Sequence, residues 1–285
     1  MIDRFDVQHR DWSESLVAAR DAGGARLILT SPPYPDARTV EQYGGAEFDT
    51  TLAGYGRLGE ACFEALMPGG VVALNIDGPV RVWRPELGES ERSLIAFEVA
   101  IDWAKRIGFR YVERVSYARE GMPGSRGPRW RNGNELVHVF ARPGARPHFD
   151  AAGCTLPAKR PGESWSAGSA RSKGVHRARS AWVQGDRRQL TTSIVAHVGS
   201  NQTDSDHPAP FALALADAFV LCYSAPDDLV CDPFVGSGPV AVSCHRHGRR
   251  FVGGDIGHRE RDARRWADIV NDGLRQTTLF DGIEA

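Results

Sequence analysis

Short apolar runs alternate along the chain with segments whose apolar residues recur at helical spacing. A short apolar run favours a buried strand, and helical spacing favours an amphipathic helix. The pattern predicts strands over residues 26–30, 71–76, 111–117, 135–141, 229–231 and 251–255. It predicts helices over residues 55–67 and 91–107, stopped by Pro68-Gly69-Gly70 and by Gly108 respectively. It predicts further helices over residues 211–223, 240–247 and 259–270. This alternation indicates an α/β fold with a mostly parallel sheet covered by helices, in which the third and fourth strands form an antiparallel pair.

The periodicity fades between about residues 142 and 197, where Gly, Pro, Ser and Arg dominate. Glycines recur there often enough to interrupt any long element. We therefore expect an insertion or a small irregular domain in this part of the chain rather than more sheet.

The same part of the chain is basic. Residues 141–190 hold ten Lys or Arg and three Asp or Glu, although the whole chain has a formal net charge of −1. Neutralisation of phosphates is the main source of nonspecific affinity for nucleic acids, so this basic block indicates a surface for a polyanion. A solvated loop is the alternative interpretation.

The remaining composition is that of an ordinary folded protein, with 41% hydrophobic and 25% charged residues. No apolar run reaches the length of a membrane span, and the N-terminus lacks the apolar stretch of a signal peptide. The five cysteines are scattered without a C-x-x-C pair, which predicts neither a disulfide framework nor a zinc site. We therefore expect a cytoplasmic protein that binds no metal.

One segment with the composition of a ligand-binding loop is Asp232-Pro233-Phe234-Val235-Gly236-Ser237-Gly238, between a predicted strand and a predicted helix. Its glycines permit a tight turn and the close approach of a ligand, and the start of the helix offers backbone N–H groups. Asp255 ends the next predicted strand, where it could accept hydrogen bonds from ribose hydroxyls. The lysine of a phosphate-binding P-loop is missing, so the pattern indicates a nucleoside cofactor, with a plain turn as the alternative.

A second segment, Thr30-Ser31-Pro32-Pro33-Tyr34, follows the first predicted strand. Its two prolines fix the backbone and remove two donors, so the carbonyls of Ser31 and Pro32 are available to a ligand. The Ser31 hydroxyl and the Tyr34 ring add an acceptor and a stacking face. This combination suits a planar group that carries an amino function, and a simple proline turn is the alternative.

Together the two segments resemble the amino-methyltransferases of DNA, and the similarity covers most of the chain. Ser31-Pro32-Pro33-Tyr34 is similar to the catalytic motif of that family in the form most typical of cytosine-N4 enzymes; adenine-N6 enzymes more often have Asp first. The segment from Asp232 to Gly238 is similar to the S-adenosylmethionine loop, and Asp255 to the acid that holds the ribose. The order of catalytic motif, basic variable block and cofactor loop is that of the circularly permuted beta class.

The resemblance implies further cofactor contacts. His207-Pro208-Ala209-Pro210-Phe211 is similar to the segment that walls the methionine side, and Asp11 lies where the family has an acid near the adenine. The expected cofactor-binding residues are Asp11, His207, Pro208, Phe211, Asp232, Pro233, Phe234, Gly236, Ser237, Gly238 and Asp255. Pro239 stands where the family usually has Thr, and Asp255 where it usually has Glu; each departure could weaken cofactor binding.

The implied fold is therefore the Rossmann-like fold of S-adenosylmethionine-dependent methyltransferases with an inserted target-recognition region. Residues 1–141 would form the catalytic part, residues 142–200 the target-recognition region and residues 201–285 the cofactor-binding part. The implied function is site-specific methylation of the exocyclic N4 amino group of cytosine in DNA. Adenine-N6 methylation and a non-catalytic DNA-binding relative are the alternatives. Methylation of cytosine C5 needs a cysteine nucleophile, and the chain has no Pro-Cys pair.

The expected catalytic residues are Ser31, Pro32, Pro33 and Tyr34, with the target base flipped out of the duplex onto Tyr34. DNA is the expected partner, and a cognate restriction endonuclease and the oligomeric state are left open. The candidate DNA-binding residues are Arg126, Arg129, Arg131, Arg171, Lys173, Arg177, Arg179, Arg187 and Arg188.

Overall fold

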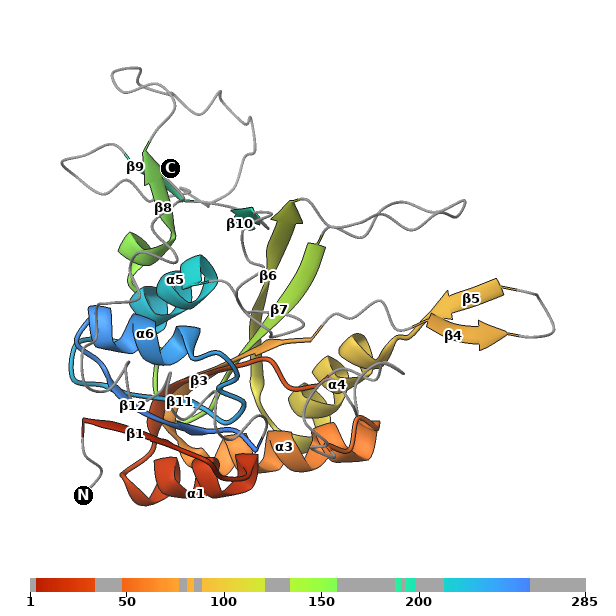
Figure 1. Ribbon diagram of the computed structural model, residues 1–285, viewed down its shortest axis with the longest axis horizontal. Helices are drawn as coiled ribbons and strands as arrows, with labels where there is room; N and C mark the ends of the chain where they lie inside the picture. Colours follow the sequence, from red (N-terminus) through yellow and green to blue (C-terminus); the bar gives the residue numbers. More distant parts are fainter. Residues whose placement is uncertain are drawn as a thin grey trace, which may run out of the picture.

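A computed structural model shows a central mixed sheet with helices on both faces (Figure 1). The structure describes residues 4–33, 48–76, 81–84, 89–120, 134–157, 188–190, 193–197 and 213–256. The sheet has eight strands in the order β1 (Phe5–Gln8), β12 (Arg250–Gly254), β11 (Leu229–Asp232), β2 (Ala25–Thr30), β3 (Leu66–Asn75), β7 (Asn134–Ala141), β6 (Arg110–Glu120) and β10 (Ser193–His197). Two small antiparallel pairs lie outside it: β4 (Arg81–Arg84) with β5 (Glu89–Arg92), and β8 (Thr155–Pro157) with β9 (Arg188–Leu190).

Neighbouring strands of the large sheet are parallel except where β7 takes part, because β7 runs antiparallel to both β3 and β6. The predicted antiparallel pair is therefore confirmed, as is the mostly parallel character of the sheet. The central strands are buried on both faces, which explains why they are continuous apolar runs rather than alternating ones.

Two apolar layers sandwich the sheet. On one face the helices α1 (Trp12–Asp21), α3 (Leu52–Ala65) and α4 (Ile95–Asp102) form a cluster with Ile28 of β2. On the other face α5 (Leu213–Tyr223) and α6 (Pro239–Arg246) form a second cluster with Leu27 and Leu29. Successive residues of a strand point to opposite faces, so β2 supplies both layers.

The helix predicted over residues 55–67 ends earlier than expected, and the prediction that Pro68-Gly69-Gly70 stops it is wrong. α3 ends at Ala65, and β3 already begins at Leu66, whose backbone is extended. Gly69 takes a φ of +76°, and the register with β2 shifts between the pairs of Ala25 and Leu27. The Pro-Gly-Gly sequence is thus accommodated as an irregularity inside a strand.

The helix predicted over residues 91–107 is shorter and irregular. Its first residues belong to β5, α4 begins at Ile95, and its last turn, Trp103–Ile107, is π-helical (η1). The predicted stop at Gly108 is confirmed, since that glycine takes a left-handed conformation with φ of +96°.

Other differences concern whole elements rather than their ends. β1 and α1 are not predicted by the sequence pattern. β10 joins the large sheet beside β6, and β8 pairs with β9, so the expectation of no more sheet between residues 142 and 197 is wrong at these three strands. The helix predicted over residues 259–270 lies outside the described residues. Within the described part of the chain, no helix combines the length and apolar character that a membrane crossing requires.

Candidate active site

The two predicted loops lie next to each other because of the sheet's strand order. β11 is followed by α6 and then β12 on one side, whereas β2 is followed by α3 and then β3 on the other side. β2 and β11 are parallel neighbours, so both loops leave the same edge of the sheet. The helices that follow them, α3 and α6, pack against opposite faces of the sheet (Figure 1). Such a switch point at the carboxyl ends of parallel strands is where open α/β sheets bind ligands.

A buried hydrogen bond joins the two strands where the loops begin. The Thr30 hydroxyl donates to Oδ1 of Asp232 over 2.9 Å, although the two residues are 202 positions apart in the chain. The same carboxylate oxygen accepts the backbone N–H of Phe234 over 3.0 Å. Burial raises the pKa of Asp232 to about 7, and these two hydrogen bonds oppose the shift only in part.

The glycine-rich loop has the backbone geometry that its sequence predicts. Gly236 and Gly238 have φ values of +50° and +87°, which residues with a side chain rarely adopt. Gly238 caps α6, and Pro239 occupies the first helical position, where its missing N–H costs no hydrogen bond. The departure from Thr at this position therefore leaves the start of the helix intact.

Asp255 lies against this loop, directly after β12. Its Oδ2 accepts the backbone N–H of Gly236 over 2.9 Å, and the carbonyl of Gly254 accepts the N–H of Val235 over 3.1 Å. A Cβ on Gly253 would lie 2.4 Å from the carbonyl oxygen of Asp232. The absence of side chains before Asp255 thus lets the acid approach the loop closely.

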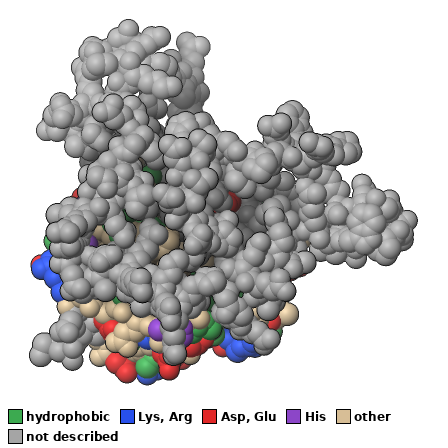
Figure 2. All heavy atoms as spheres, in the orientation of Figure 1, with side chains coloured by type: hydrophobic (Ala, Val, Ile, Leu, Met, Phe, Trp, Pro, Cys, Tyr) green, Lys and Arg blue, Asp and Glu red, His purple; other side chains and the backbone are tan. Residues whose placement is uncertain are grey.

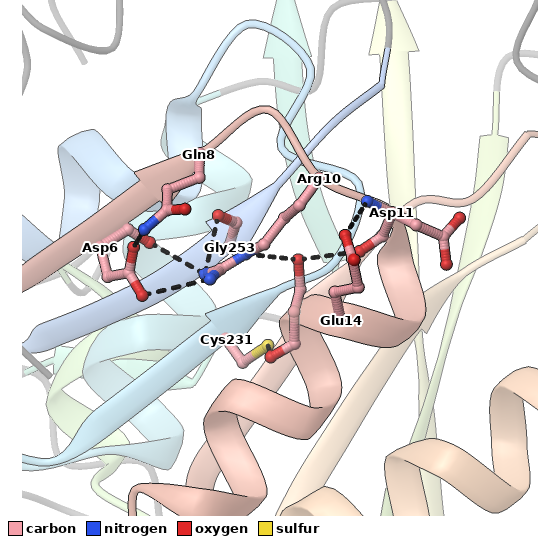
Figure 3. A network of polar contacts seen from close by, with 8 residues as sticks. Asp6, Gln8, Arg10, Asp11, Glu14, Cys231 and Gly253 are labelled. Carbon is pink, nitrogen blue, oxygen red and sulfur yellow. Dashed lines mark hydrogen bonds and ion pairs between the residues drawn. The ribbon is translucent and has the colours of Figure 1, made fainter. Parts of the chain in front are cut away.

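Arg10 binds the end of β12 from the side of β1. The sequence analysis did not identify this residue. Its guanidinium group donates to the Asp6 carboxylate over 3.2 Å, to the Ser15 hydroxyl over 3.3 Å and to the Gly253 carbonyl over 3.2 Å (Figure 3). These contacts fasten the end of β1 and the start of α1 to β12. Arg10 therefore supports the strand that carries Asp255.

Asp11, expected near the adenine of the cofactor, is the N-cap of α1. Its side chain accepts the N–H of Ser13 over 2.9 Å. The Glu14 carboxylate in turn accepts the N–H of Asp11 over 3.0 Å (Figure 3). This reciprocal pair is a capping box, which gives the acid a structural role at the start of the helix. Its contact with a cofactor stays a prediction.

The described part of the second loop consists of Ser31, Pro32 and Pro33, of which Pro32 is buried and the other two are half-buried. The carbonyl of Pro33 accepts a hydrogen bond of 2.6 Å from the hydroxyl of Tyr55 in α3. Neither Thr30 nor Tyr55 carries a sequence signal for this role, because each reads as an ordinary core residue of a strand or a helix.

A series of aromatic rings lies beside both loops. The ring centroid of Phe48 lies 5.2 Å from that of Phe234 and 5.3 Å from that of Tyr55, and Trp12 follows at 6.2 Å from Phe48. Aromatic faces, an acid and a glycine turn at a helix start are the groups that a nucleoside with a charged tail requires. The residues present therefore fit S-adenosylmethionine.

Several predicted site residues lie outside the described residues. They are Tyr34, Arg126, Arg129, Arg131, Arg171, Lys173, Arg177, Arg179, Arg187, His207, Pro208 and Phe211. Arg188 lies in β9, opposite Pro157 of β8. The structure thus brings together Ser31, the Asp232 loop and Asp255, and leaves the other expected contacts as predictions.

The described surface of α1 and α3 carries charges of both signs (Figure 2). Nε of Arg20 lies 3.1 Å from Oδ1 of Asp21, and Nη2 of Arg57 lies 2.6 Å from Oδ2 of Asp49. Both pairs are largely solvent-exposed. Interspersed charges of this kind create no strong field of one sign. The basic block over residues 141–190 remains the better candidate for a polyanion surface.

Comparison with known proteins gives a consistent picture. A family model described as DNA methylase, of the N6/N4 methyltransferase type, matches residues 25–263, a span that contains both loops and Asp255. The orphan methyltransferase M.BamHII of Bacillus amyloliquefaciens is 24% identical over 267 residues, which are 89% of this chain and 90% of that protein.

Solved structures of low sequence identity share the fold. The PvuII DNA methyltransferase, described as cytosine-N4-specific, has a TM-score of 0.60 at 17% identity, over 94% of this chain and 95% of its own. The putative DNA modification methylase TTHA0409 of Thermus thermophilus, complexed with S-adenosylmethionine, has a TM-score of 0.60 at 21% identity over 98% and 96%. The M1.HpyAVI–SAM complex has a TM-score of 0.56 at 16% identity over 92% and 98%.

Proposed function

The chain belongs to the N6/N4 family of DNA methylases, and from that membership we propose that it methylates the exocyclic N4 amino group of cytosine at a specific DNA sequence. The family depends on S-adenosylmethionine, and two of the structural neighbours were crystallised with it. The predicted family, methyltransferase fold and cofactor are therefore confirmed. The choice of base and the roles of individual residues are our proposal.

The observation that carries the choice of cytosine is Ser31 in the first position of the catalytic motif. It follows β2 directly and lies half-buried at the sheet edge shared with the Asp232 loop. The PvuII enzyme, named as cytosine-N4-specific, supports the proposal as a neighbour of the same fold. Adenine-N6 methylation is the second candidate, because the matched family spans both reactions.

We assign the cofactor to the loop after β11 and to Asp255. Asp255 would accept hydrogen bonds from the ribose hydroxyls, Gly236 and Gly238 would allow the ligand to approach the backbone, and Phe234 would face the ligand's flat base. S-adenosylmethionine supplies an electrophilic methyl group on a sulfonium sulfur when it is bound. The chain must then place a nucleophile opposite this methyl group.

The amino group of cytosine is a weak nucleophile because its lone pair is conjugated into the ring. The Ser31 hydroxyl and the Pro32 carbonyl would accept its two hydrogens and so turn the lone pair out of conjugation. This contribution is one of position and electrostatics, which suits a rigid loop of acceptors. The nitrogen becomes strongly acidic only after methyl transfer, so no strong base is required beforehand.

The base must leave the duplex before its amino nitrogen can react. Tyr34 would stack on the extruded cytosine, and the basic residues between 141 and 190 would hold the phosphates on either side. In this scheme the Ser31 loop acts on the base, the Asp232 loop holds the cofactor, and the basic block provides affinity for DNA.

Product analysis tests the proposal directly. The purified protein is incubated with S-adenosylmethionine and unmethylated DNA, the DNA is digested to nucleosides, and the product is identified by mass spectrometry. We expect N4-methylcytosine. N6-methyladenine would overturn the choice of base, and the absence of both products together with absent cofactor binding would indicate a non-catalytic relative.

A further inference from the structure

A buried phenol on α3 holds the catalytic loop. The hydroxyl of Tyr55 donates to the carbonyl of Pro33 over 2.6 Å, and the Tyr55 side chain is fully buried. Pro32 and Pro33 have no N–H to anchor the loop to the protein. We propose that Tyr55 is a positioning residue for methyl transfer, which holds the loop so that Ser31 and Pro32 face the target base; this inference rests on the proposed function.

Tyr55 is itself held rigidly, as such a role requires. Its backbone carbonyl accepts the indole N–H of Trp103 over 2.9 Å, and Trp103 is fully buried. Gly59, one turn further along α3, allows this contact, because a Cβ there would lie 2.5 Å from the Trp103 ring. The Tyr55 hydroxyl therefore projects from a helix that is packed tightly against η1. This packing keeps the hydroxyl in a fixed position, to which the loop is bound.

The Tyr55 ring and the Tyr55 hydroxyl act on different parts of the site. The ring contacts Phe48, which contacts Phe234 of the cofactor loop, whereas the hydroxyl bonds the catalytic loop. Replacement of Tyr55 by Phe keeps the ring and removes only the hydroxyl. The two loops can thus be separated experimentally, since cofactor binding depends on the ring cluster and methyl transfer on the hydroxyl.

A displacement of about 1 Å in a reacting group can cost on the order of 100-fold in rate. We therefore expect Tyr55→Phe to lower the single-turnover rate constant for transfer of labelled methyl to DNA by about 10-fold to 100-fold. The dissociation constant of S-adenosylmethionine, measured by calorimetry, should be unchanged. If the hydroxyl only stabilised the fold, Tyr55→Phe would lower the melting temperature. The transfer rate would then not fall while the cofactor affinity stays unchanged.

Tyr223→Phe is the matched control. The Tyr223 hydroxyl donates to the Glu113 carboxylate, and the residue is buried at the end of α5. α5 ends just before β11 begins, so this bond lies at the sheet edge opposite the loops. The control loses a phenol hydrogen bond that lies away from both loops, and it should keep the wild-type transfer rate.

The transfer assay counts methyl groups on any base, which separates this inference from the choice of cytosine. A wild-type rate for Tyr55→Phe would overturn the positioning role, and so would an equal loss in Tyr223→Phe. A Tyr55→Phe protein that fails to fold would show that the hydroxyl serves stability, and would overturn it too. If the product is N6-methyladenine and Tyr55→Phe is slow, only the choice of base is overturned. If the wild-type protein is inactive on all DNA, both the proposed function and the positioning role of Tyr55 are overturned.

Discussion

Ser31 is the residue on which the proposed reaction depends most. Replacement by Ala removes the hydroxyl that would accept an amino hydrogen, while the Pro32 carbonyl remains. We expect turnover to fall on the order of 100-fold, comparable to the loss of one preorganised hydrogen-bonding group in other active sites. Cofactor affinity should change little, because Asp255 and the Asp232 loop are untouched.

Steady-state kinetics and calorimetry together test this expectation. Ser243→Ala in α6 is a suitable control, because its buried hydroxyl has no hydrogen-bond partner within the described part of the chain. Parallel losses of turnover and cofactor affinity in Ser31→Ala would contradict the assigned role.

Asp232 makes stability depend on pH in an unusual direction. Burial, together with the nearby charge of Asp255, raises its pKa from 3.8 to about 7. Between these values the folded protein holds a proton that the unfolded chain has released, so the free energy of unfolding falls as pH rises. The contribution is fully present below pH 3.8 and is lost by the time the pH passes about 7.

Asp232→Asn removes this titration but keeps an oxygen for Thr30 and Phe234. Relative to wild type, the variant should gain stability as pH rises from about 4.5 to about 7, with a slope of at most about 1.4 kcal/mol per pH unit. Urea unfolding of both proteins across this interval measures the difference, in which contributions from other groups cancel. Parallel stability curves would show that the carboxyl group titrates normally.

Thr30→Val tests the hydrogen bond that joins the two loops. The substitution keeps the shape of the side chain and deprives the buried carboxyl group of one donor. We expect a loss of about 1–3 kcal/mol in the free energy of unfolding and weaker binding of S-adenosylmethionine. Thr30→Ser keeps the hydroxyl and should retain most of the cofactor affinity. If Val and Ser variants bound the cofactor equally well, the hydroxyl would have no part in shaping the loop.

Among individual residues, the sequence predicts those whose own chemistry suits the reaction or the cofactor. It misses those whose role is to hold another residue in place. Ser31, Gly236 and Asp255 stand out because a motif or a strand end marks them. Thr30 and Tyr55 become visible only when strand register and helix packing bring them to Asp232 and Pro33. No local pattern encodes either contact.

At the level of elements, the end of β12 is the most constrained part of the site. A Cβ at Gly253 would meet the backbone of β11 and a methyl group of Val235, at 2.4 Å and 2.7 Å. Backbone atoms of a central strand cannot move aside, so Gly253→Ala should destabilise the protein by about 1–3 kcal/mol. Displacement of Asp255 should also weaken cofactor binding.

Gly56→Ala in α3 is the matched substitution. Its added Cβ would come within 2.7 Å of the end of the Arg106 side chain and lie in ordinary contact with Asp102 Oδ2, at 3.6 Å. The Arg106 side chain is half-exposed and can move. Alanine also has the better helix propensity. Chemical unfolding of the two variants should therefore rank Gly253→Ala as far more damaging, and a mild effect there would mean that β12 can shift away from β11.

The elements that the sequence predicts well are those buried on both faces. β2, β11 and β12 consist almost entirely of buried residues, so their apolar runs are clear. β1 is half-buried at the sheet edge and alternates only weakly, and no continuous apolar run marks it. The boundary between α3 and β3 differs from the prediction because Pro68-Gly69-Gly70 breaks a helix in most contexts, whereas here it falls within a strand irregularity.

For the whole molecule, we expect the loops at the sheet to bind the cofactor and the basic block over residues 141–190 to bind DNA. Neutral replacements at Arg171, Lys173, Arg177 and Arg179 should weaken DNA binding and leave S-adenosylmethionine binding unchanged. Each lost phosphate contact should reduce the slope of log affinity against log salt by about 0.9. Fluorescence anisotropy at several KCl concentrations measures this slope, and an unaltered slope would place the DNA surface elsewhere.

The pairing of β2 with β11 has a consequence for the folding of the chain during its synthesis. β11 emerges about 200 residues after β2, as the 202 positions between Thr30 and Asp232 show. At about 5–20 residues per second, the inner edge of β2 waits roughly 10–40 seconds for its partner. During that time it is an unpaired apolar strand, the kind of edge that recruits other chains. Slower translation should therefore lengthen the time during which this edge can pair with another chain.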